Sequence, residues 1–244
     1  MTDLVLLPGT LCDERLFAHQ LEHLAGIASV EVGDLTTADT ITGMAAAVLD
    51  RAPPRFAVAG LSLGGIVAIE MMRIAPERIS KLALLDTNHS PPTPSQVTSW
   101  KLFEELTLGG RFADVTRRYL LDSLLHDKTP ESIALVLDMA ARVGGERFLI
   151  QNAAHPTRPD NRRVLPTINV PTLVLCGRED RVCPVSVHKE LAAAIPGARL
   201  VVIPGAGHLS TIDQPELVTQ AMHSWLSASH QAVLTTTETT ETTP

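Results

Sequence analysis

The segment Gly60-Leu61-Ser62-Leu63-Gly64 places a serine between two glycines, where a strand and a helix are expected to meet. Residues 55–59 form a short apolar run typical of a buried strand, and residues 64–75 are typical of a helix. On so sharp a turn the serine is open to a reactant, and the flanking glycines let the strand and the helix approach each other. The Leu63 backbone N–H lies at the helix start, where it can stabilise an oxyanion. The motif therefore predicts that Ser62 is a nucleophile.

A serine hydroxyl attacks well only when a base removes its proton. Among the histidines after Ser62, His208 alone follows a strand through a glycine-bracketed turn, Gly205-Ala206-Gly207. Such a turn leaves the imidazole free to reach across the sheet edge. His188 and His223 fall in predicted helices and are better explained as helix side chains. We therefore expect His208 to be the base.

The base in turn needs a carboxylate that fixes its tautomer. The loop after strand 172–176 offers Asp180, which leaves room for one helix and one strand before His208. Glu179 is its immediate neighbour and the local alternative. Asp86, at the end of strand 81–86, is a second alternative, although a role in its own turn is the simpler interpretation. Asp180 is the acid we expect.

A second oxyanion donor is expected from the loop after the first strand. Residues 4–7 are a continuous apolar run that ends at Pro8-Gly9-Thr10. The Thr10 N–H is the expected partner of the Leu63 N–H. Pro8-Gly9 would equally serve an ordinary turn that ends a strand.

The expected elements alternate between strand and helix along most of the chain. Apolar runs predict strands at 4–7, 29–32, 55–59, 81–86, 172–176 and 199–203, and helical spacing predicts helices at 13–24, 39–50, 64–75 and 214–227. Strands that are apolar on both faces favour a parallel sheet covered by helices on both sides. The predicted fold class is therefore α/β, a mostly parallel, doubly wound sheet with its site at the carboxyl ends of the strands.

The predicted domains divide the chain into a core, an insertion and a tail. The core comprises residues 1–90 and 166–228, and residues 91–165, hereafter the cap, show helical periodicity without a convincing strand. The cap is expected to cover the carboxyl ends of the strands. Residues 229–244 are predicted to be disordered, because residues 235–244 are seven Thr, two Glu and one Pro and cannot bury a core.

Residues 3–227 resemble the α/β-hydrolase superfamily, in particular its compact, single-lid branch of esterases, lactonases and carbon–carbon bond hydrolases. The resemblance is carried by the Ser62 motif, by Gly177-Arg178-Glu179-Asp180 with Pro184, and by Gly205-Ala206-Gly207-His208. Pro8-Gly9 departs from the His-Gly pair common at the oxyanion loop of this superfamily. The resemblance implies hydrolysis of an ester, thioester or lactone through an acyl-enzyme, without a metal or organic cofactor.

Other activities remain open on the same Ser-His-Asp triad. They are the hydrolysis of enol-lactones or carbon–carbon bonds and a cofactor-free perhydrolase reaction. Haloalkane dehalogenases and epoxide hydrolases need a carboxylate nucleophile, so Ser62 disfavours both. An alternative of a different class is a non-catalytic binding module for a small molecule on a hydrolase scaffold.

The overall composition restricts the kind of partner. The chain has 20 basic and 27 acidic residues, a net charge of −7, which disfavours nucleic acid. No apolar stretch approaches the length of a membrane helix, and no signal peptide is visible, so we expect a cytoplasmic protein with three reduced cysteines. His19 and His23 have helical spacing but lack the rest of a zinc motif, so we interpret them as helix-surface histidines.

The sequence of the cap gives only limited information about the substrate. The arginines of the cap could bind an acidic acyl chain or a carrier protein, although we favour the interpretation that they lie on solvated helix faces. These arginines are Arg111, Arg117, Arg118, Arg142, Arg147, Arg158, Arg162 and Arg163. Its larger apolar residues could line an acyl pocket or form the core of the cap; they are Phe103, Phe112, Leu120, Leu124 and Phe148. A short cap with few aromatic residues favours small, uncharged esters or lactones as substrates.

Overall fold

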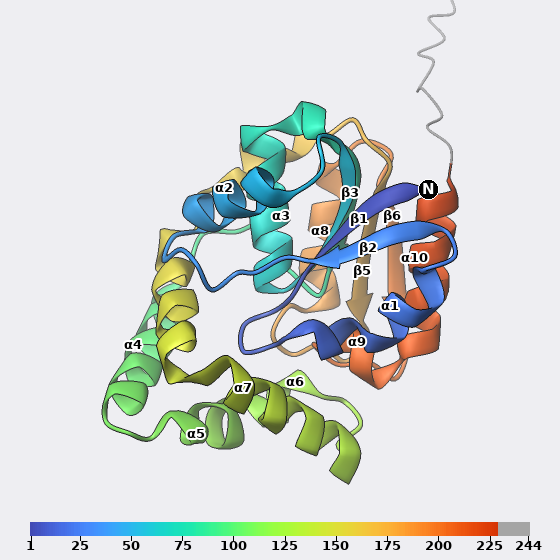
Figure 1. Cartoon of the computed structure of the whole chain (residues 1–244). Helices are drawn as coiled ribbons and strands as arrows, with labels where there is room; N and C mark the ends of the chain where they lie inside the picture. The colour runs from blue at the N-terminus through green and yellow to red at the C-terminus, as the bar shows by residue number, and fades with distance from the viewer. Residues whose placement is uncertain (229–244) are drawn as a thin grey trace, which may run out of the picture.

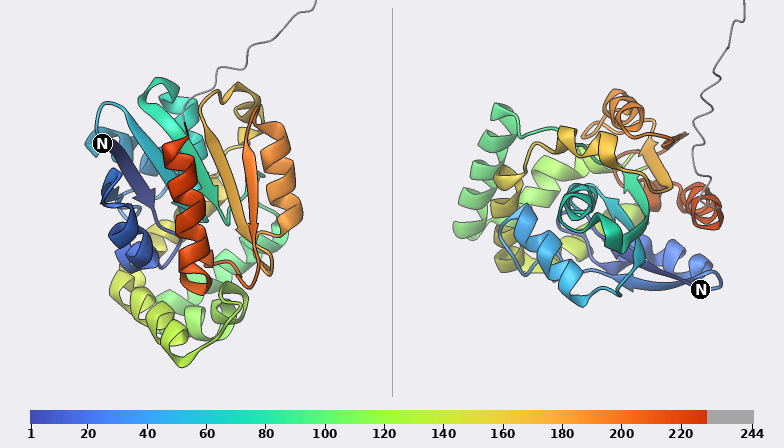
Figure 2. Two further views of the ribbon diagram at one scale, coloured as in Figure 1. Left: turned by 90° about the vertical axis from the view of Figure 1, so that its right-hand side faces the viewer. Right: turned by 90° about the horizontal axis from the view of Figure 1, so that it is seen from above.

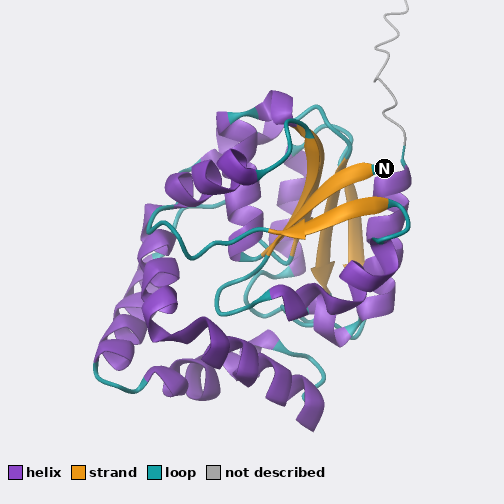
Figure 3. Ribbon diagram, in the orientation of Figure 1, coloured by secondary structure: helices purple, strands orange, loops and turns teal. Residues whose placement is uncertain are grey.

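A single parallel sheet forms the centre of the computed structural model, which describes residues 1–228 (Figures 1 and 3). Its strands are β1 (Thr2–Leu7), β2 (Ala28–Val32), β3 (Phe56–Leu61), β4 (Ile79–Leu85), β5 (Thr172–Gly177) and β6 (Arg199–Ile203). They lie in the order β2-β1-β3-β4-β5-β6, and every neighbouring pair is parallel. The predicted fold class is confirmed. The tail predicted to be disordered lies outside the described residues.

Helices cover both faces of this sheet. One face carries α2 (Ile41–Arg51), α3 (Leu63–Ile74) and α8 (Val185–Ala194), and the other carries α1 (Ala18–Leu24) and α10 (Pro215–Ser227) (Figure 2). Along β1, Val5 and Leu7 join the first hydrophobic core, while Leu4 and Leu6 join the second. Successive side chains of a strand point to opposite faces, which is why a strand covered on both sides is apolar throughout.

Short helical segments complete the sheet domain. They are η1 (Glu14–Phe17) before α1, η2 (Pro76–Arg78) after α3, and α9 (Ser210–Asp213) before α10. Proline at position 76 lies at the start of η2, directly after the end of α3, as expected from its inability to continue a helix. Within the described residues, no helix combines the length and the apolar character that crossing a bilayer requires.

The segment between β4 and β5 is helical and lies at one end of the sheet (Figures 1 and 2). It contains α4 (Pro94–Leu108), α5 (Phe112–Asp114), η3 (Val115–Leu120), α6 (Leu121–Leu124), α7 (Pro130–Ala154), η4 (His155–Thr157), η5 (Asn161–Arg163) and η6 (Leu165–Thr167). Thr93 begins α4 with a capping box, and Gly144, at φ 77°, breaks α7. The helices α4 and α7 pack on a small apolar core of their own around Phe103 and Phe148. The exact domain limits stay a prediction.

The contact between β3, α3 and the end of β1 is the tightest part of the sheet domain. A Cβ on Gly60 would lie 2.2 Å from the Gly64 carbonyl carbon, and one on Gly64 would lie 2.0 Å from the Leu7 carbonyl oxygen. Both distances are far below van der Waals contact with backbone atoms, which cannot move aside as a side chain can. Glycine at positions 60 and 64 therefore sets how closely the helix approaches the sheet.

Replacing Gly64 with alanine should destabilise the protein by about 3 kcal/mol or prevent folding, because the added methyl group collides with the backbone of β1. Thermal unfolding of the purified variant measures the loss. The exposed Gly26 is the matched control, since a Cβ there meets nothing within 4 Å. Equal melting temperatures for Gly64→Ala and Gly26→Ala would contradict this account of the turn.

Candidate active site

Ser62 lies in a strained backbone conformation between β3 and α3. Its φ of 54° and ψ of −113° are unusual for a residue with a side chain. Two contacts with the neighbouring strand end hold it there. The Ser62 N–H donates to the Leu85 carbonyl at 3.0 Å, and the Thr87 hydroxyl donates to the Ser62 carbonyl at 2.7 Å. The strain keeps the serine hydroxyl at the sheet edge rather than within the helix.

The structure brings Ser62, His208 and Asp180 into one hydrogen-bonded chain. The Ser62 Oγ lies 2.9 Å from His208 Nε2, and His208 Nδ1 lies 2.9 Å from Asp180 Oδ2. A carboxylate only accepts, so His208 donates from Nδ1 and its Nε2 can accept the serine proton. The Asp180 carboxylate is itself held by the Val182 and Cys183 N–H groups, both 2.8 Å from Oδ1. This is the order of contacts expected from the sequence.

The two loops that carry the base and the acid are packed against each other. A Cβ on Gly177 would lie 2.2 Å from the Ala206 carbonyl oxygen, so the loops need glycine to come this close. Glu179, the local alternative to Asp180, is part of this contact. Its N–H donates to the Ala206 carbonyl at 2.9 Å, and its carboxylate accepts from the Ala206 N–H at 3.1 Å. Glu179 therefore fixes the turn that carries His208 and makes no hydrogen bond to the imidazole.

Asp86, the second alternative, is fully buried behind the site. It accepts from the Gly177 N–H at 2.8 Å and from the Ser210 hydroxyl at 2.5 Å. Burial, with the nearby negative charge of Asp180, raises the pKa of Asp86 to about 8. The raised pKa favours the neutral form of this carboxyl, which links the ends of β4 and β5 to α9 and makes no hydrogen bond to the imidazole.

The electrostatic environment of His208 favours its protonated form. Burial lowers the pKa of the imidazole, but the Asp180 charge and hydrogen bond outweigh burial and hold the pKa of His208 above its usual value. The side chain is only 3% exposed. Asp180, Cys183 and His208 also have potential metal-ligand atoms within 4.8 Å of one another. Burial raises the pKa of the Cys183 thiol, and the other two groups are already paired, so the hydrogen-bonded relay accounts for the cluster.

The expected oxyanion loop lies directly on the serine turn. A Cβ on Gly9 would be 3.5 Å from the Ser62 Cβ, and Leu11 has a φ of 62°. Within residues 1–228 neither the Thr10 nor the Leu63 N–H donates a hydrogen bond to another protein group. Both N–H groups are therefore free for a ligand beside Ser62. Their role as an oxyanion hole stays a prediction.

The cap contacts this loop through two side chains that the sequence analysis left without a role. Gln151 Oε1 accepts from the Leu11 N–H at 3.0 Å, and His155 Nε2 shares a hydrogen bond of 2.8 Å with the Thr10 hydroxyl. Burial lowers the pKa of His155 to about 3, so the ring is neutral. Nothing local in the sequence marks either residue, because they meet the loop only after the cap folds back onto the sheet.

A cavity of about 140 Å³ opens above Ser62, between the sheet edge and the cap; we call it the Ser62 cavity. Its apolar wall comes mainly from the cap and includes Phe103, Leu120, Leu124 and Phe148. Phe112 instead packs on Phe148, with ring centroids 5.6 Å apart, and is part of the core of the cap. The polar residues that line the Ser62 cavity include Asn88, Gln96, Asn152, His155 and Arg158. Both interpretations of the apolar cap residues therefore hold, since Phe103 and Phe148 line the cavity and also belong to the core of the cap.

Four other histidines of the described chain lie on helices. His188 is buried in α8, where its Nε2 accepts from the Thr87 N–H at 2.9 Å and burial lowers its pKa. His223 is an exposed residue of α10. His19 and His23 stack on each other with ring centroids 3.9 Å apart, and His19 shares a hydrogen bond with the Thr219 hydroxyl. These contacts agree with the interpretation of all four as helix side chains.

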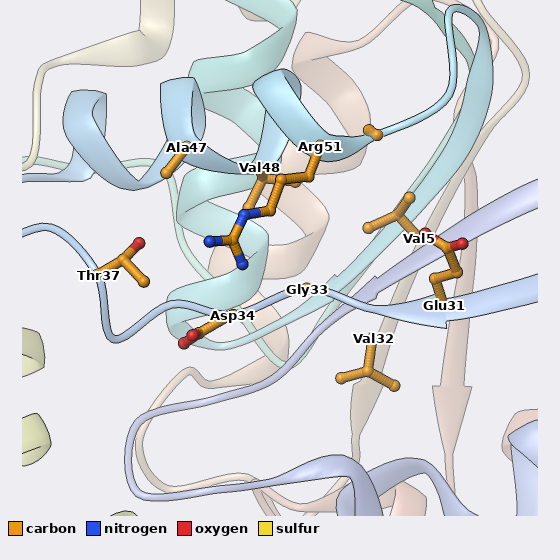
Figure 4. Close-up of a pocket in the computed structure, with 10 residues that line it drawn as sticks. Val5, Glu31, Val32, Gly33, Asp34, Thr37, Ala47, Val48 and Arg51 are labelled. Atoms are coloured by element: carbon orange, nitrogen blue, oxygen red, sulfur yellow. The ribbon is translucent and has the colours of Figure 1, made fainter.

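A second cavity, of about 150 Å³, lies between the end of β2 and helix α2 (Figure 4). Glu31, Asp34 and Arg51 are its charged residues, and Thr37 lies across from Arg51 (Figure 4). None of the described residues that line it is a histidine or cysteine that could act with a hydroxyl group as base or nucleophile. The Ser62 cavity therefore stays the candidate active site.

Comparison with known proteins places this architecture in a family. The model of the alpha/beta hydrolase family matches residues 4–221. A pimeloyl-[acyl-carrier protein] methyl ester esterase of Nitrosomonas europaea is 29% identical over 191 residues, 73% of this chain and 74% of that protein. A 2-hydroxy-6-oxononadienedioate/2-hydroxy-6-oxononatrienedioate hydrolase of Paraburkholderia phymatum is 30% identical over 179 residues, 68% of this chain and 60% of that protein.

Among solved structures, a thermophilic esterase from Thermogutta terrifontis, determined with malate bound, is similar over nearly the whole chain. It superposes with a TM-score of 0.85 at 27% identity, covering 95% of this chain and 91% of the esterase. The matched family model spans both the core and the cap. The chain therefore belongs to the alpha/beta hydrolase family.

Proposed function

We propose that this protein is a serine hydrolase that cleaves a carboxylic ester, thioester or lactone of a small molecule. The observation that carries the proposal is the relay from Ser62 through His208 to Asp180, with both hydrogen bonds at 2.9 Å. The serine end of this relay faces the Ser62 cavity, where a reactant can bind. Membership of a hydrolase family and similarity to esterases support the same conclusion.

In this mechanism His208 takes the proton of Ser62 as the serine oxygen attacks the carbonyl carbon. The N–H groups of Thr10 and Leu63 stabilise the oxyanion. His208, oriented by Asp180, then protonates the leaving alcohol or thiol. It next activates a water molecule that releases the acid from Ser62. No step requires a cofactor.

Cleavage of a carbon–carbon bond is the second candidate, and the similarity to the Paraburkholderia phymatum hydrolase favours it. The same serine, base and oxyanion donors would act on a ketone carbonyl, and a carbanion would leave instead of an alcohol. Two further alternatives are a perhydrolase reaction and the binding of a ligand without turnover on the same scaffold. Steady hydrolysis of simple esters and lactones would favour the first proposal over these alternatives.

Replacing Ser62 with alanine should lower the hydrolysis rate of a chromogenic acetate ester by roughly 10³–10⁶-fold, because the nucleophile is lost. The rate is measured by release of the chromophore, and thermal unfolding should show that the variant still folds. The exposed Ser224 on α10, whose hydroxyl donates to the Gln220 carbonyl, supplies the control Ser224→Ala. A Ser62→Ala protein with the wild-type rate would end the proposal.

The activity should rise with pH through an apparent pKa above 6.5, the ordinary histidine value. Only neutral His208 accepts the serine proton, and Asp180 stabilises the protonated form. Lowering the pH through the raised pKa therefore removes the base. The dependence of kcat/KM on pH measures this limb. A limb centred below 6.5 would contradict the electrostatic account of His208.

Asparagine substitutions separate the roles of the two buried aspartates. Asp180→Asn should lower kcat by roughly 10³–10⁴-fold, because the imidazole loses its orienting carboxylate. Asp86→Asn should keep most of its activity, because Asp86 makes no hydrogen bond to His208 and an amide resembles the neutral form that its raised pKa favours. If Asp86→Asn lost more activity than Asp180→Asn, the assignment of the acid would be reversed.

The raised pKa of Asp86 also predicts an effect on the stability of the folded protein. The folded pKa of Asp86 is above its unfolded value, so its stabilising contribution is full below about pH 4 and declines as pH rises through about 8. Asp86→Asn removes this dependence and should become more stable relative to the wild type as the pH rises over that range. Unfolding curves of both proteins between pH 5 and 9 measure the difference. Parallel pH profiles would contradict the raised pKa.

A further inference from the structure

Arg158 differs from the other arginines of the cap. It is only 6% exposed and lines the Ser62 cavity. The others are exposed, as expected for solvated helix faces; they are Arg111, Arg117, Arg118, Arg142, Arg147, Arg162 and Arg163. A buried arginine loses hydration and is normally compensated by an acidic partner.

The contacts of Arg158 do not supply that partner. One terminal nitrogen donates to the Gln96 side-chain oxygen at 3.2 Å, and the guanidinium lies 5.9 Å from the Trp100 ring centroid. Its Nε has no hydrogen-bond partner in the described part of the chain. Within residues 1–228 no carboxylate oxygen lies within 4.0 Å of the guanidinium. Burial lowers the pKa of Arg158, as expected for a cation without a counter-ion.

A comparison within the same protein shows how a buried charge is compensated when no ligand is involved. Glu70 is completely buried, and it pairs with Arg73 at 2.6 Å. Its two oxygens also accept from Thr42 at 2.6 Å and Asn161 at 3.2 Å. The fold thus satisfies its buried carboxylate in full, whereas the Arg158 guanidinium keeps free donors beside a cavity.

Among the described residues, those that line the cavity also provide no negative charge to pair with Arg158. None of the described residues that line it is an aspartate or glutamate, so Arg158 is its unopposed charge. The side-chain oxygens of Asn88 and Asn152, which also line the cavity, have no hydrogen-bond partner among the described residues. A carboxylate cannot donate to these oxygens, so it is the Arg158 guanidinium that favours an anionic group.

We propose that Arg158 binds a free carboxylate group of the substrate, so that the natural substrate is an ester, thioester or lactone that is also an acid. A guanidinium matches a carboxylate with two parallel hydrogen bonds, and a low-dielectric wall strengthens the pair. This proposal rests on the proposed hydrolase function and deepens it. It also replaces the expectation of uncharged substrates, which came from the small size of the cap and not from its charge.

The experiment compares acidic esters with neutral esters of equal chain length, followed by titration of the released acid. In one series the acid part carries the carboxylate: monoethyl succinate, glutarate and adipate against ethyl butyrate, valerate and hexanoate. In a second series the alcohol part carries it: 4-acetoxybutanoate against butyl acetate. We expect the wild type to prefer one acidic series by about tenfold to a hundredfold in kcat/KM.

Arg158→Gln should lose this preference, and Arg158→Lys, which keeps the charge without the planar fork, should keep part of it. Arg162→Gln is the matched control, because Arg162 is exposed on the same segment and pairs only with Asp160 in the described structure. A purely structural role of Arg158 would change the rates on acidic and neutral esters together. The ratio between them is therefore the informative readout.

The outcomes separate the two proposals. A wild type that hydrolyses both kinds of ester without preference, or an Arg158→Gln protein that keeps the preference, overturns the carboxylate subsite and leaves the hydrolase function intact. Turnover that survives in Ser62→Ala overturns the hydrolase function instead. If Arg158→Gln does not fold, the preference of the wild type and of Arg158→Lys still decides the question.

Discussion

The close approach of α3 to the sheet at the serine turn is the constraint on which the site depends. Gly60 and Gly64 let the helix start within contact of the β1 and β3 backbones, and Ser62 takes up the resulting strain at a φ of 54°. With a side chain at either glycine, the helix start would move, and with it the Leu63 N–H and the serine hydroxyl. The Ser62 hydroxyl and the Leu63 N–H, which we propose as nucleophile and oxyanion donor, are thus placed by backbone packing.

The site is assembled from segments held by different kinds of contact. Contacts within the core fix the loops that carry Asp180 and His208, among them the hydrogen bond from the Glu179 N–H to the Ala206 carbonyl and the glycine contact at Gly177. The loop that carries Thr10, in contrast, is held by side chains of the cap, Gln151 and His155. The cap therefore lines the Ser62 cavity and also contacts a loop of the core. In the proposed reaction, a change in the cap would affect the rate as well as the choice of substrate.

The buried ionisable side chains of this protein differ in how the surrounding structure compensates their charge. Glu70 is fully paired and links α3 to α2 and η5. Asp86 is accommodated by a raised pKa and so costs little as a neutral acid. Asp180 is paired with the catalytic imidazole, and Arg158 is left open toward the cavity. Glu70 and Asp86 link elements of the fold, whereas Asp180 holds the imidazole of His208 and Arg158 lines the Ser62 cavity.

The sequence by itself determined the sheet, its helices and the nucleophile turn, because those depend on local apolar periodicity and on glycines at fixed spacing. It also selected Asp180 and His208 through their loops at strand ends, and the structure brings them together with Ser62. Only the tertiary structure decided between Asp180, Glu179 and Asp86, since all three follow strands that end at one edge. It alone separated Arg158 from the other cap arginines, because burial and the absence of a counter-ion arise from packing between distant segments.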